Sequence, residues 1–306
     1  MKTIMPDSCL RFACLAGACR HTCCAGWEID VDADALARYR AVPGTLGQRL
    51  QEAIEETDSA AHFRLTAEER CPFLNRDNLC DLIIGLGEDS LCQICTDHPR
   101  FRNCLSDRTE VGLGLCCEAA GKLLLGWQEP VRLVTVQDDG MDDPPDDEEQ
   151  ALLTLRGALM GLMQDRSMSF ADRLAALSHR CRFPDRPWPA WRAFLLTLER
   201  LDDAWAQALH ALPDDPPPLS ADWDIPFEQL TVCLLFRHLP GALDDGDIVG
   251  RVRFCVLVTG LLRALLAAHP APTLDDLVEL ARLYSSEIEY SDENVDVILA
   301  ELGREA

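Results

Sequence analysis

The most constraining feature of this chain is a dense field of cysteines near its start. Of 15 cysteines, twelve lie in the first 117 residues, at positions 9, 14, 19, 23, 24, 71, 80, 92, 95, 104, 116 and 117. Lys2, Asp7 and Arg11 interrupt the opening stretch, so we expect no export signal and a cytoplasmic, reducing location. Disulfides are rare in such a compartment. Closely spaced cysteines there indicate metal or redox chemistry.

Charge and composition narrow the partners and the fold class. The chain has 28 basic and 52 acidic residues, a net charge of -24. Nucleic-acid binders usually present a basic face, so we expect no nucleic-acid partner and an acidic surface that favours lysine-bearing proteins. Aromatic residues make up only 6% of the chain, which favours helices over a β-sandwich. No apolar run approaches the roughly 20 residues that span a membrane.

The sequence predicts a mainly α protein in two parts. Residues 1–137 are expected to form a loop-rich, cysteine-dense, metal-binding domain, and residues 150–306 an irregular α-helical domain. Between them, residues 138–149 read DDGMDDPPDDEE, in which eight of twelve residues are acidic and two are proline. This composition is typical of a solvated linker.

Helical spacing of apolar residues defines the expected elements. In the first domain we expect short helices over 32–39, 46–56, 88–96 and 118–125, with Asp32 or Asp34 as the first N-cap. In the second, Ser169 and Thr273 are expected N-caps. The helices predicted there cover 148–164, 169–179, 188–212, 227–238, 247–268, 273–284 and 292–302.

The densest local motif is Cys14-x4-Cys19-x3-Cys23-Cys24. Neighbouring side chains diverge, so one cysteine of the adjacent pair can ligate an ion while the other packs or serves a second centre. A zinc site takes four thiolates or imidazoles, and an iron–sulfur cluster also takes four cysteines. The region therefore supplies more thiols than one centre needs. The alternative is a set of buried structural thiols.

Further motifs follow, and together they resemble the flagellin lysine N-methylase family. The order is C-x4-C-x3-CC-x-GW, then CPFL from Cys71, LC at Cys80, C-x3-PRF from Cys95, and C-x-E from Cys116. The similarity covers roughly residues 9–128. The resemblance implies methylation of flagellin lysines with S-adenosylmethionine as donor and an iron–sulfur cluster, expected as 4Fe-4S with zinc as the alternative.

The resemblance also implies a set of metal ligands. Where the family often has proline after its last cysteine, this chain has Cys117, so either Cys116 or Cys117 is the ligand. Cys9, Cys92, Cys104 and Cys117 look additional to the family pattern. The implied ligands are Cys14, Cys19, Cys23, Cys24, Cys71, Cys80, Cys95 and Cys116.

Methyl transfer to lysine requires a neutral amine, so a proton acceptor is needed. Asp97, His98 and Glu118 follow the cysteine motifs closely and are the candidates, each with a structural alternative; His98 is also a candidate metal ligand. Arg100 either binds the carboxylate of the methyl donor or ties down a loop. The rival to a methylase is a non-catalytic zinc- or iron-chelating protein whose helical domain binds a partner.

Overall fold

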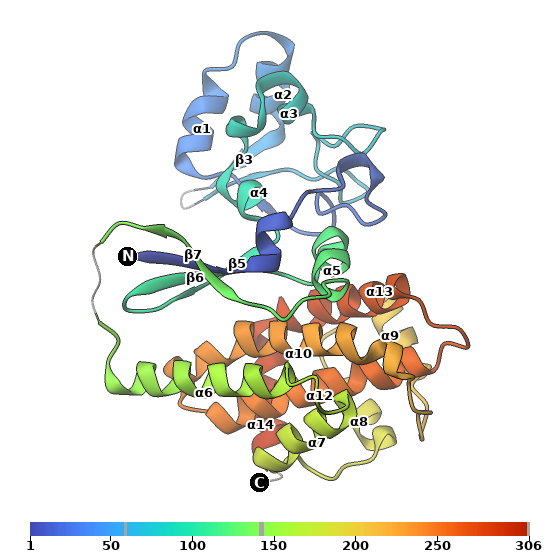
Figure 1. The fold of residues 1–306 in the computed structure, drawn as a ribbon. Helices are drawn as coiled ribbons and strands as arrows, with labels where there is room; N and C mark the ends of the chain where they lie inside the picture. The colour runs from blue at the N-terminus through green and yellow to red at the C-terminus, as the bar shows by residue number, and fades with distance from the viewer. Residues whose placement is uncertain (58–59, 141–143, 305–306) are drawn as a thin grey trace. The chain divides into compact units, whose positions relative to one another are not determined.

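The computed structural model describes residues 1–57, 60–140 and 144–304 (Figure 1). It contains two compact units, which we call the cysteine unit, Ala13–Arg100, and the helical unit, Met1–Phe12 with Phe101–Ala306. Helices take 56% of the residues and strands 11%, so the prediction of a mainly α protein is confirmed. Among the described helices, none has the length and apolar character needed to cross a bilayer.

The helical unit contains a four-stranded sheet that the sequence did not predict. Its strand order is β5 (Arg100–Cys104), β6 (Arg108–Leu113), β1 (Lys2–Pro6) and β7 (Leu133–Asp138). β1 runs parallel to β6 and antiparallel to β7. This pairing places both the first residues and the segment 101–138 in the helical unit. The units therefore divide at residues 12 and 100, whereas the sequence placed the boundary at 137.

A buried ion pair fixes the sheet to the helices of the same unit. Glu110 on β6 is fully buried and accepts two hydrogen bonds from Arg156 on α6, at 2.5 and 2.6 Å. Asn103 on β5 donates to the carbonyl of Phe236 on α10 at 3.1 Å. Because both charges of the pair are removed from water, this contact requires the sheet and the helix to keep one register.

The helices of this unit follow the predicted positions closely. The side chains of Ser169 and Thr273 cap α7 and α13, as predicted. Asp146 caps α6, so this helix starts inside the expected linker, of which residues 141–143 lie outside the described part. The helices are α5 (Glu118–Leu125), α6 (Asp147–Met163), α7 (Phe170–Arg180), α8 (Trp188–Leu195), α9 (Asp203–His210), α10 (Asp224–His238), α11 (Ala242–Asp245), α12 (Ile248–Ala267), α13 (Leu274–Tyr284) and α14 (Asp292–Arg304).

The prediction of one continuous helix over 188–212 was wrong, because the chain forms two separate helices there, α8 and α9. The carboxylate of Glu287 accepts hydrogen bonds from the backbone N–H groups of Leu201 and Asp202. Asp202 in turn caps α9 through the N–H of Ala204 at 2.8 Å. A side chain some 85 residues away therefore satisfies backbone donors that a continuous helix would have used.

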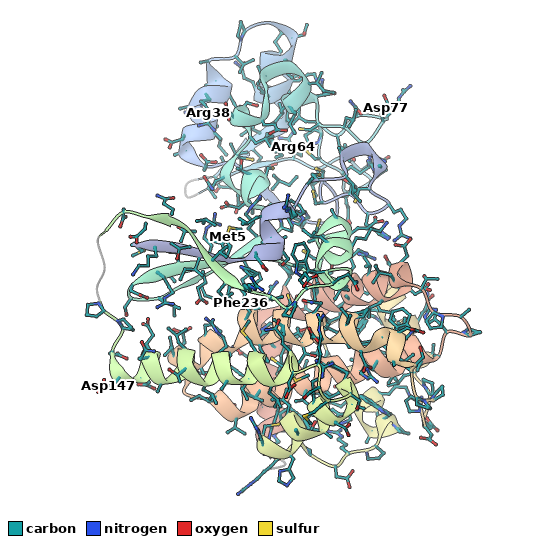
Figure 2. The ribbon with its side chains drawn as sticks, viewed as in Figure 1. Met5, Arg38, Arg64, Asp77, Asp147 and Phe236 are labelled. Atoms are coloured by element: carbon teal, nitrogen blue, oxygen red, sulfur yellow. The ribbon has the colours of Figure 1, made fainter. Side chains whose placement is uncertain are left out.

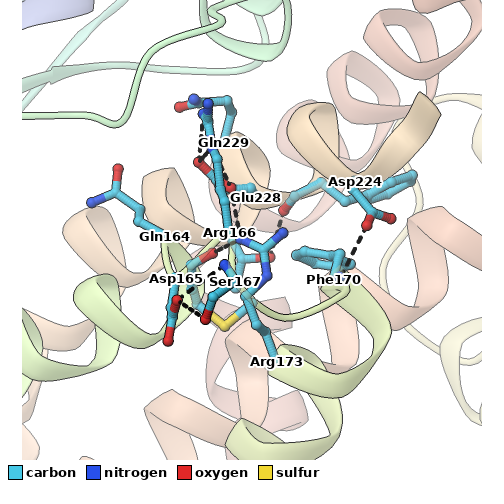
Figure 3. A network of polar contacts seen from close by, with 12 residues as sticks. Gln164, Asp165, Arg166, Ser167, Phe170, Arg173, Asp224, Glu228 and Gln229 are labelled. Carbon is cyan, nitrogen blue, oxygen red and sulfur yellow. Dashed lines mark hydrogen bonds and ion pairs between the residues drawn. The ribbon is translucent and has the colours of Figure 1, made fainter. Parts of the chain in front are cut away.

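A second buried charge cluster joins α7 and α10 (Figure 3). Glu228 is fully buried and accepts hydrogen bonds from Arg166 at 2.8 Å and from Arg173 at 2.6 Å. At the start of α7, the N–H of Phe170 donates to Asp224 at 3.0 Å. These contacts hold the first turn of α7 against the start of α10.

The cysteine unit is built from short elements around its own apolar core. A three-stranded antiparallel sheet has the order β2-β4-β3. The predicted helix over 46–56 ends early and continues as a strand, and the one over 88–96 is interrupted at Leu91 and Cys92. The elements are β2 (Ile29–Asp30), α1 (Ala33–Arg40), α2 (Gly44–Ala53), β3 (Ile54–Glu56), β4 (Ala61–Phe63), α3 (Asp81–Leu86) and α4 (Gln93–Asp97).

Candidate metal centre

Five thiols gather in the apolar core of the cysteine unit. Cys71 and Cys92 are buried members of this core, and Cys24, Cys80 and Cys95 pack against it. None of the five is in a disulfide. We call these five residues the thiol cluster.

Backbone hydrogen bonds and a contact between sulfur atoms hold the thiol cluster together. The N–H of Cys71 donates to the carbonyl of Cys24 at 2.7 Å, which joins the first cysteine motif to the second. Leu74 and Cys80 form an isolated β-bridge, so the chain returns after the CPFL turn. The sulfur atoms of Cys92 and Cys95 lie 3.4 Å apart. Segments that are distant in sequence therefore bring their cysteines to one place.

The electrostatics of the thiol cluster show that its sulfurs affect one another. Burial, with added charge from Cys24, Cys80 and Cys92, raises the pKa of Cys71 to about 12. The hydrogen bond between Cys92 and Cys95 raises the pKa of Cys95 and lowers that of Cys92. A hydrogen bond from Cys23 lowers the pKa of Cys24 to about 7. Because like charges in an apolar site disfavour each other, the five thiols cannot all ionise without a cation.

Helix α1 holds the segment around Cys92 in place. The side chain of Asp32, one of the two N-caps predicted from the sequence, accepts from the N–H of Ala35 and also from that of Gln93 at 2.7 Å. Arg38, labelled in Figure 2, donates to the carbonyl of Leu91 at 3.1 Å. The residues on both sides of Cys92 are therefore hydrogen-bonded to α1.

Among the described residues of this unit, two buried polar side-chain atoms make no hydrogen bond of standard geometry. They are the hydroxyl oxygen of Tyr39 and Nε2 of His98. The Tyr39 ring is 1% exposed and packs against Phe63, with ring centroids 5.9 Å apart. The His98 ring stacks on Trp27 at 6.3 Å, and the Trp27 indole N–H donates to the carbonyl of Cys23 at 2.7 Å. Buried polar atoms without partners are uncommon and point to a missing acceptor or donor.

The other implied ligands lie outside the thiol cluster. Cys14 is exposed, and its sulfur accepts from the N–H of Ala16 at 3.3 Å. The sulfur of Cys19 donates to the carbonyl of His21 at 2.9 Å. Cys23 is exposed, unlike the half-buried Cys24 beside it. Cys24, Cys71, Cys80 and Cys95 thus pack in the core of the cysteine unit, whereas Cys14 and Cys23 are exposed and Cys19 is half-buried outside that core. Cys23 nevertheless stays in hydrogen-bond contact with Cys24.

The last implied ligand, Cys116, belongs to the helical unit together with Cys9, Cys104 and Cys117. Burial raises the pKa of Cys116 to about 11, although a hydrogen bond with Tyr290 acts in the opposite direction.

Cys92 is the member of the thiol cluster that the sequence reasoning set aside. It is fully buried and lies beside Cys95. The signal was available, because Cys92 and Cys95 form a Cys-x2-Cys pair, the spacing common in zinc sites.

The candidate proton acceptors have different surroundings. Asp97 accepts from the side-chain amide of Gln93 at 2.8 Å. Glu118 is 2% exposed and ion-paired with Lys122 at 3.0 Å in the helical unit. Burial lowers the pKa of His98, which keeps its imidazole neutral. His98 is thus the candidate that is neither ion-paired nor hydrogen-bonded through Nε2.

Arg100 fits the loop-anchoring alternative, since its guanidinium donates to the carbonyl of Thr96 at 3.2 Å. This bond closes the turn between α4 and β5 around Pro99.

The chemistry of the thiol cluster fits a thiolate-bound metal. Cysteine sulfurs are the donors used by iron–sulfur clusters and by structural zinc. Within the described residues, no three His, Cys, Asp or Glu side chains are already arranged around the position of a single ion. The residues that would hold a metal are Cys24, Cys71, Cys80, Cys92 and Cys95, and binding would draw their sulfurs together.

The fold and site together define a mainly α protein with a cluster of cysteine thiols in a small unit of its own. No family profile matches the chain, and no solved structure is similar to it. Two lysine-N-methylases are similar to it, from Salmonella typhimurium strain LT2 (29% identity over 121 residues) and from Salmonella choleraesuis strain SC-B67 (28% over 120). Each match covers 37% of this chain and 30% of the relative.

A third relative is the flagellar biosynthetic protein FliU of Salmonella muenchen. It is 28% identical over 120 residues, which are 37% of this chain and 71% of that protein. These relatives confirm the resemblance to flagellin lysine N-methylases that the cysteine motifs predicted, for a little over a third of the chain. The match spans less than a third of the length of the first two relatives.

Proposed function

We propose that this chain is a protein-lysine N-methylase that transfers methyl groups from S-adenosylmethionine to lysine side chains of flagellin. The observation that carries the proposal is the similarity to two lysine-N-methylases. The name of the flagellar relative supports flagellin as the substrate. We further propose that the thiol cluster holds an iron–sulfur cluster, whose chemistry when bound would be electron transfer or activation of the donor.

In a polar transfer, the lysine nitrogen attacks the methyl carbon of the sulfonium, the carbon–sulfur bond breaks, and S-adenosylhomocysteine leaves. The lysine must first lose a proton, because its pKa in water is about 10.4. We assign this proton to Nε2 of His98, which has no hydrogen-bond partner and whose imidazole is kept neutral by burial. Since Nε2 is buried, substrate binding has to expose it.

A depression in the cysteine unit suits a cationic side chain. It is lined by Trp27 and by the carboxylates of Glu28, Glu55 and Glu69. Glu55 is ion-paired with Arg64, at 3.2 Å, so the lining keeps an excess of negative charge. An ammonium group would be attracted both by this charge and by the face of the indole ring.

The test is a reaction of the anaerobically purified full-length chain with flagellin and S-adenosylmethionine, followed by intact-mass spectrometry. We expect flagellin to gain whole methyl increments, and we expect Cys71→Ala to abolish the gain. Cys255→Ala is the matched control, because Cys255 is a fully buried thiol of the helical unit.

Unmodified flagellin with protein that has taken up its metal would contradict the methylase assignment. That result would favour the rival function, a metal-chelating protein.

A further inference from the structure

We propose that Cys92 is a ligand of the metal centre and that the hydroxyl of Tyr39 donates a hydrogen bond to the Cys92 sulfur when that sulfur is metal-bound. This inference rests on the metal centre of the proposed function. It adds a ligand outside the family pattern and a positioning residue that holds no metal itself.

The position of Cys92 supports its role as a ligand. Its side chain is fully buried in the core of the cysteine unit, and its sulfur lies 3.4 Å from that of Cys95. The hydrogen bonds from Gln93 to Asp32 and from Arg38 to Leu91 fix the backbone on either side of it. A ligand held this way loses little conformational freedom when it binds a metal.

Tyr39 lies on α1, the same helix that fixes the Cys92 segment. Its ring is 1% exposed and packs on Phe63, so the hydroxyl cannot turn to water. Burial raises the pKa of this hydroxyl, and the neighbouring Cys92 and Cys95 act in the same direction, Cys92 also through a hydrogen-bond interaction. By strict hydrogen-bond geometry, however, the hydroxyl has no acceptor. This buried hydroxyl beside two thiols therefore has no well-formed hydrogen bond, which is uncommon for a buried polar group.

Metal binding would provide that acceptor. A neutral thiol is a weak acceptor, whereas a metal-bound thiolate, whose proton has been released to solvent, carries negative charge and accepts strongly. Hydrogen bonds to ligating groups orient them, and their loss typically weakens metal binding by about 10- to 100-fold. We therefore expect Tyr39 to slow the release of the metal without being needed for its uptake.

The chain contains a matched control for each residue. Tyr284 is also fully buried with a hydroxyl that has no hydrogen-bond partner, but it belongs to the helical unit. Cys255 matches Cys92 in burial and also belongs to the helical unit. Tyr284→Phe and Cys255→Ala therefore remove the same atoms from an equally buried setting.

The experiment compares Tyr39→Phe, Tyr284→Phe, Cys92→Ala and Cys255→Ala with the wild-type full-length protein. Each is loaded anaerobically with ferrous iron and sulfide, its bound iron and sulfide are measured, and iron release to a chelator is followed by visible absorption. We expect Cys92→Ala to lose most of its bound iron. Tyr39→Phe should load like the wild type and release iron about tenfold faster. Both control variants should behave like the wild type.

Full iron content in Cys92→Ala, or release at the wild-type rate from Tyr39→Phe, would overturn the inference. Equal acceleration in Tyr39→Phe and Tyr284→Phe would also overturn it, because a general loosening of the fold would then explain the effect. A wild-type chain that takes up no iron would overturn it as well. Methylation is not the readout, so a protein that loads as expected but fails to methylate flagellin would contradict only the proposed reaction.

Discussion

Replacing Glu289 by Gln should destabilise the helical unit in a way that depends on pH. Its carboxylate is 1% exposed and accepts from His238 at 2.8 Å and from Ser285 at 2.5 Å. The guanidinium of Arg237 lies 3.4 Å away. Burial alone would raise the pKa of Glu289, but these partners lower it from 4.5 to about 2. The charged carboxylate is therefore favoured in the folded state.

The size of the effect follows from this shift. A lowering of about 2.5 pKa units at 1.36 kcal/mol per unit corresponds to about 3 kcal/mol. When the pKa of a carboxyl group is lower in the folded than in the unfolded state, its charge stabilises the folded state. This contribution is complete above the unfolded-state pKa and disappears as the pH falls toward 2. At about pH 3.5 roughly 2 kcal/mol should remain. The stability gap between the wild type and Glu289→Gln should thus narrow by about 1 kcal/mol between neutral pH and pH 3.5.

Urea unfolding followed by tryptophan fluorescence measures this gap. Five of the six tryptophans belong to the helical unit, so the signal reports the unit that contains Glu289: Trp127, Trp188, Trp191, Trp205 and Trp223. Comparing the two proteins at each pH cancels the titration of the other carboxylates. A gap that stays constant or widens as the pH falls would refute the reasoning.

Three further predictions use other sites. Glu228→Gln should cost about 3–5 kcal/mol in the same unfolding assay, because it leaves the 2%-exposed Arg173 without its carboxylate; Asp203→Asn, in an exposed pair with Arg200, should cost no more than about 0.5 kcal/mol. His98→Gln should lower the rate of flagellin methylation about 100-fold or more while leaving iron content unchanged, and an unchanged rate would exclude His98 as the proton acceptor. If the net charge of -24 attracts the lysine-bearing substrate, methylation below saturation should slow as salt rises; a salt-independent rate would exclude such steering.

Local patterns allowed part of the fold to be predicted. The helix expected over 118–125 is α5 with the same bounds, and the N-caps Ser169 and Thr273 act as expected. Of the two candidates for the first cap, Asp32 and Asp34, the structure selects Asp32. In each case the deciding contacts lie within a few residues along the chain. Side-chain caps and apolar spacing are local properties, so one sequence is enough to recognise them.

The features that were missed depend on contacts between distant residues. β1 pairs with β6 and β7, about a hundred or more positions away, and five-residue strands carry little periodicity of their own. The break before α9 is set by Glu287, which no local pattern around 200 reveals.

The candidate site was predicted in part for the same reason. Motifs indicated candidate metal-ligating cysteines, and the structure brings four of them into one core: Cys24, Cys71, Cys80 and Cys95. The Cys-x2-Cys spacing with Cys95 was a local signal for Cys92. No motif could show, however, that Cys92 is buried in this core or that Tyr39 places its hydroxyl there. Both facts depend on how α1 packs against the segment before α4.

The most direct test of the central claim is the mass of flagellin co-expressed with this chain in a host that has no other flagellin methylase. The account predicts methyl-lysine on flagellin from cells that express the wild-type chain, and none when Cys71→Ala is expressed at the same level. Flagellin that stays unmodified beside a wild-type chain that has bound its metal would contradict the account.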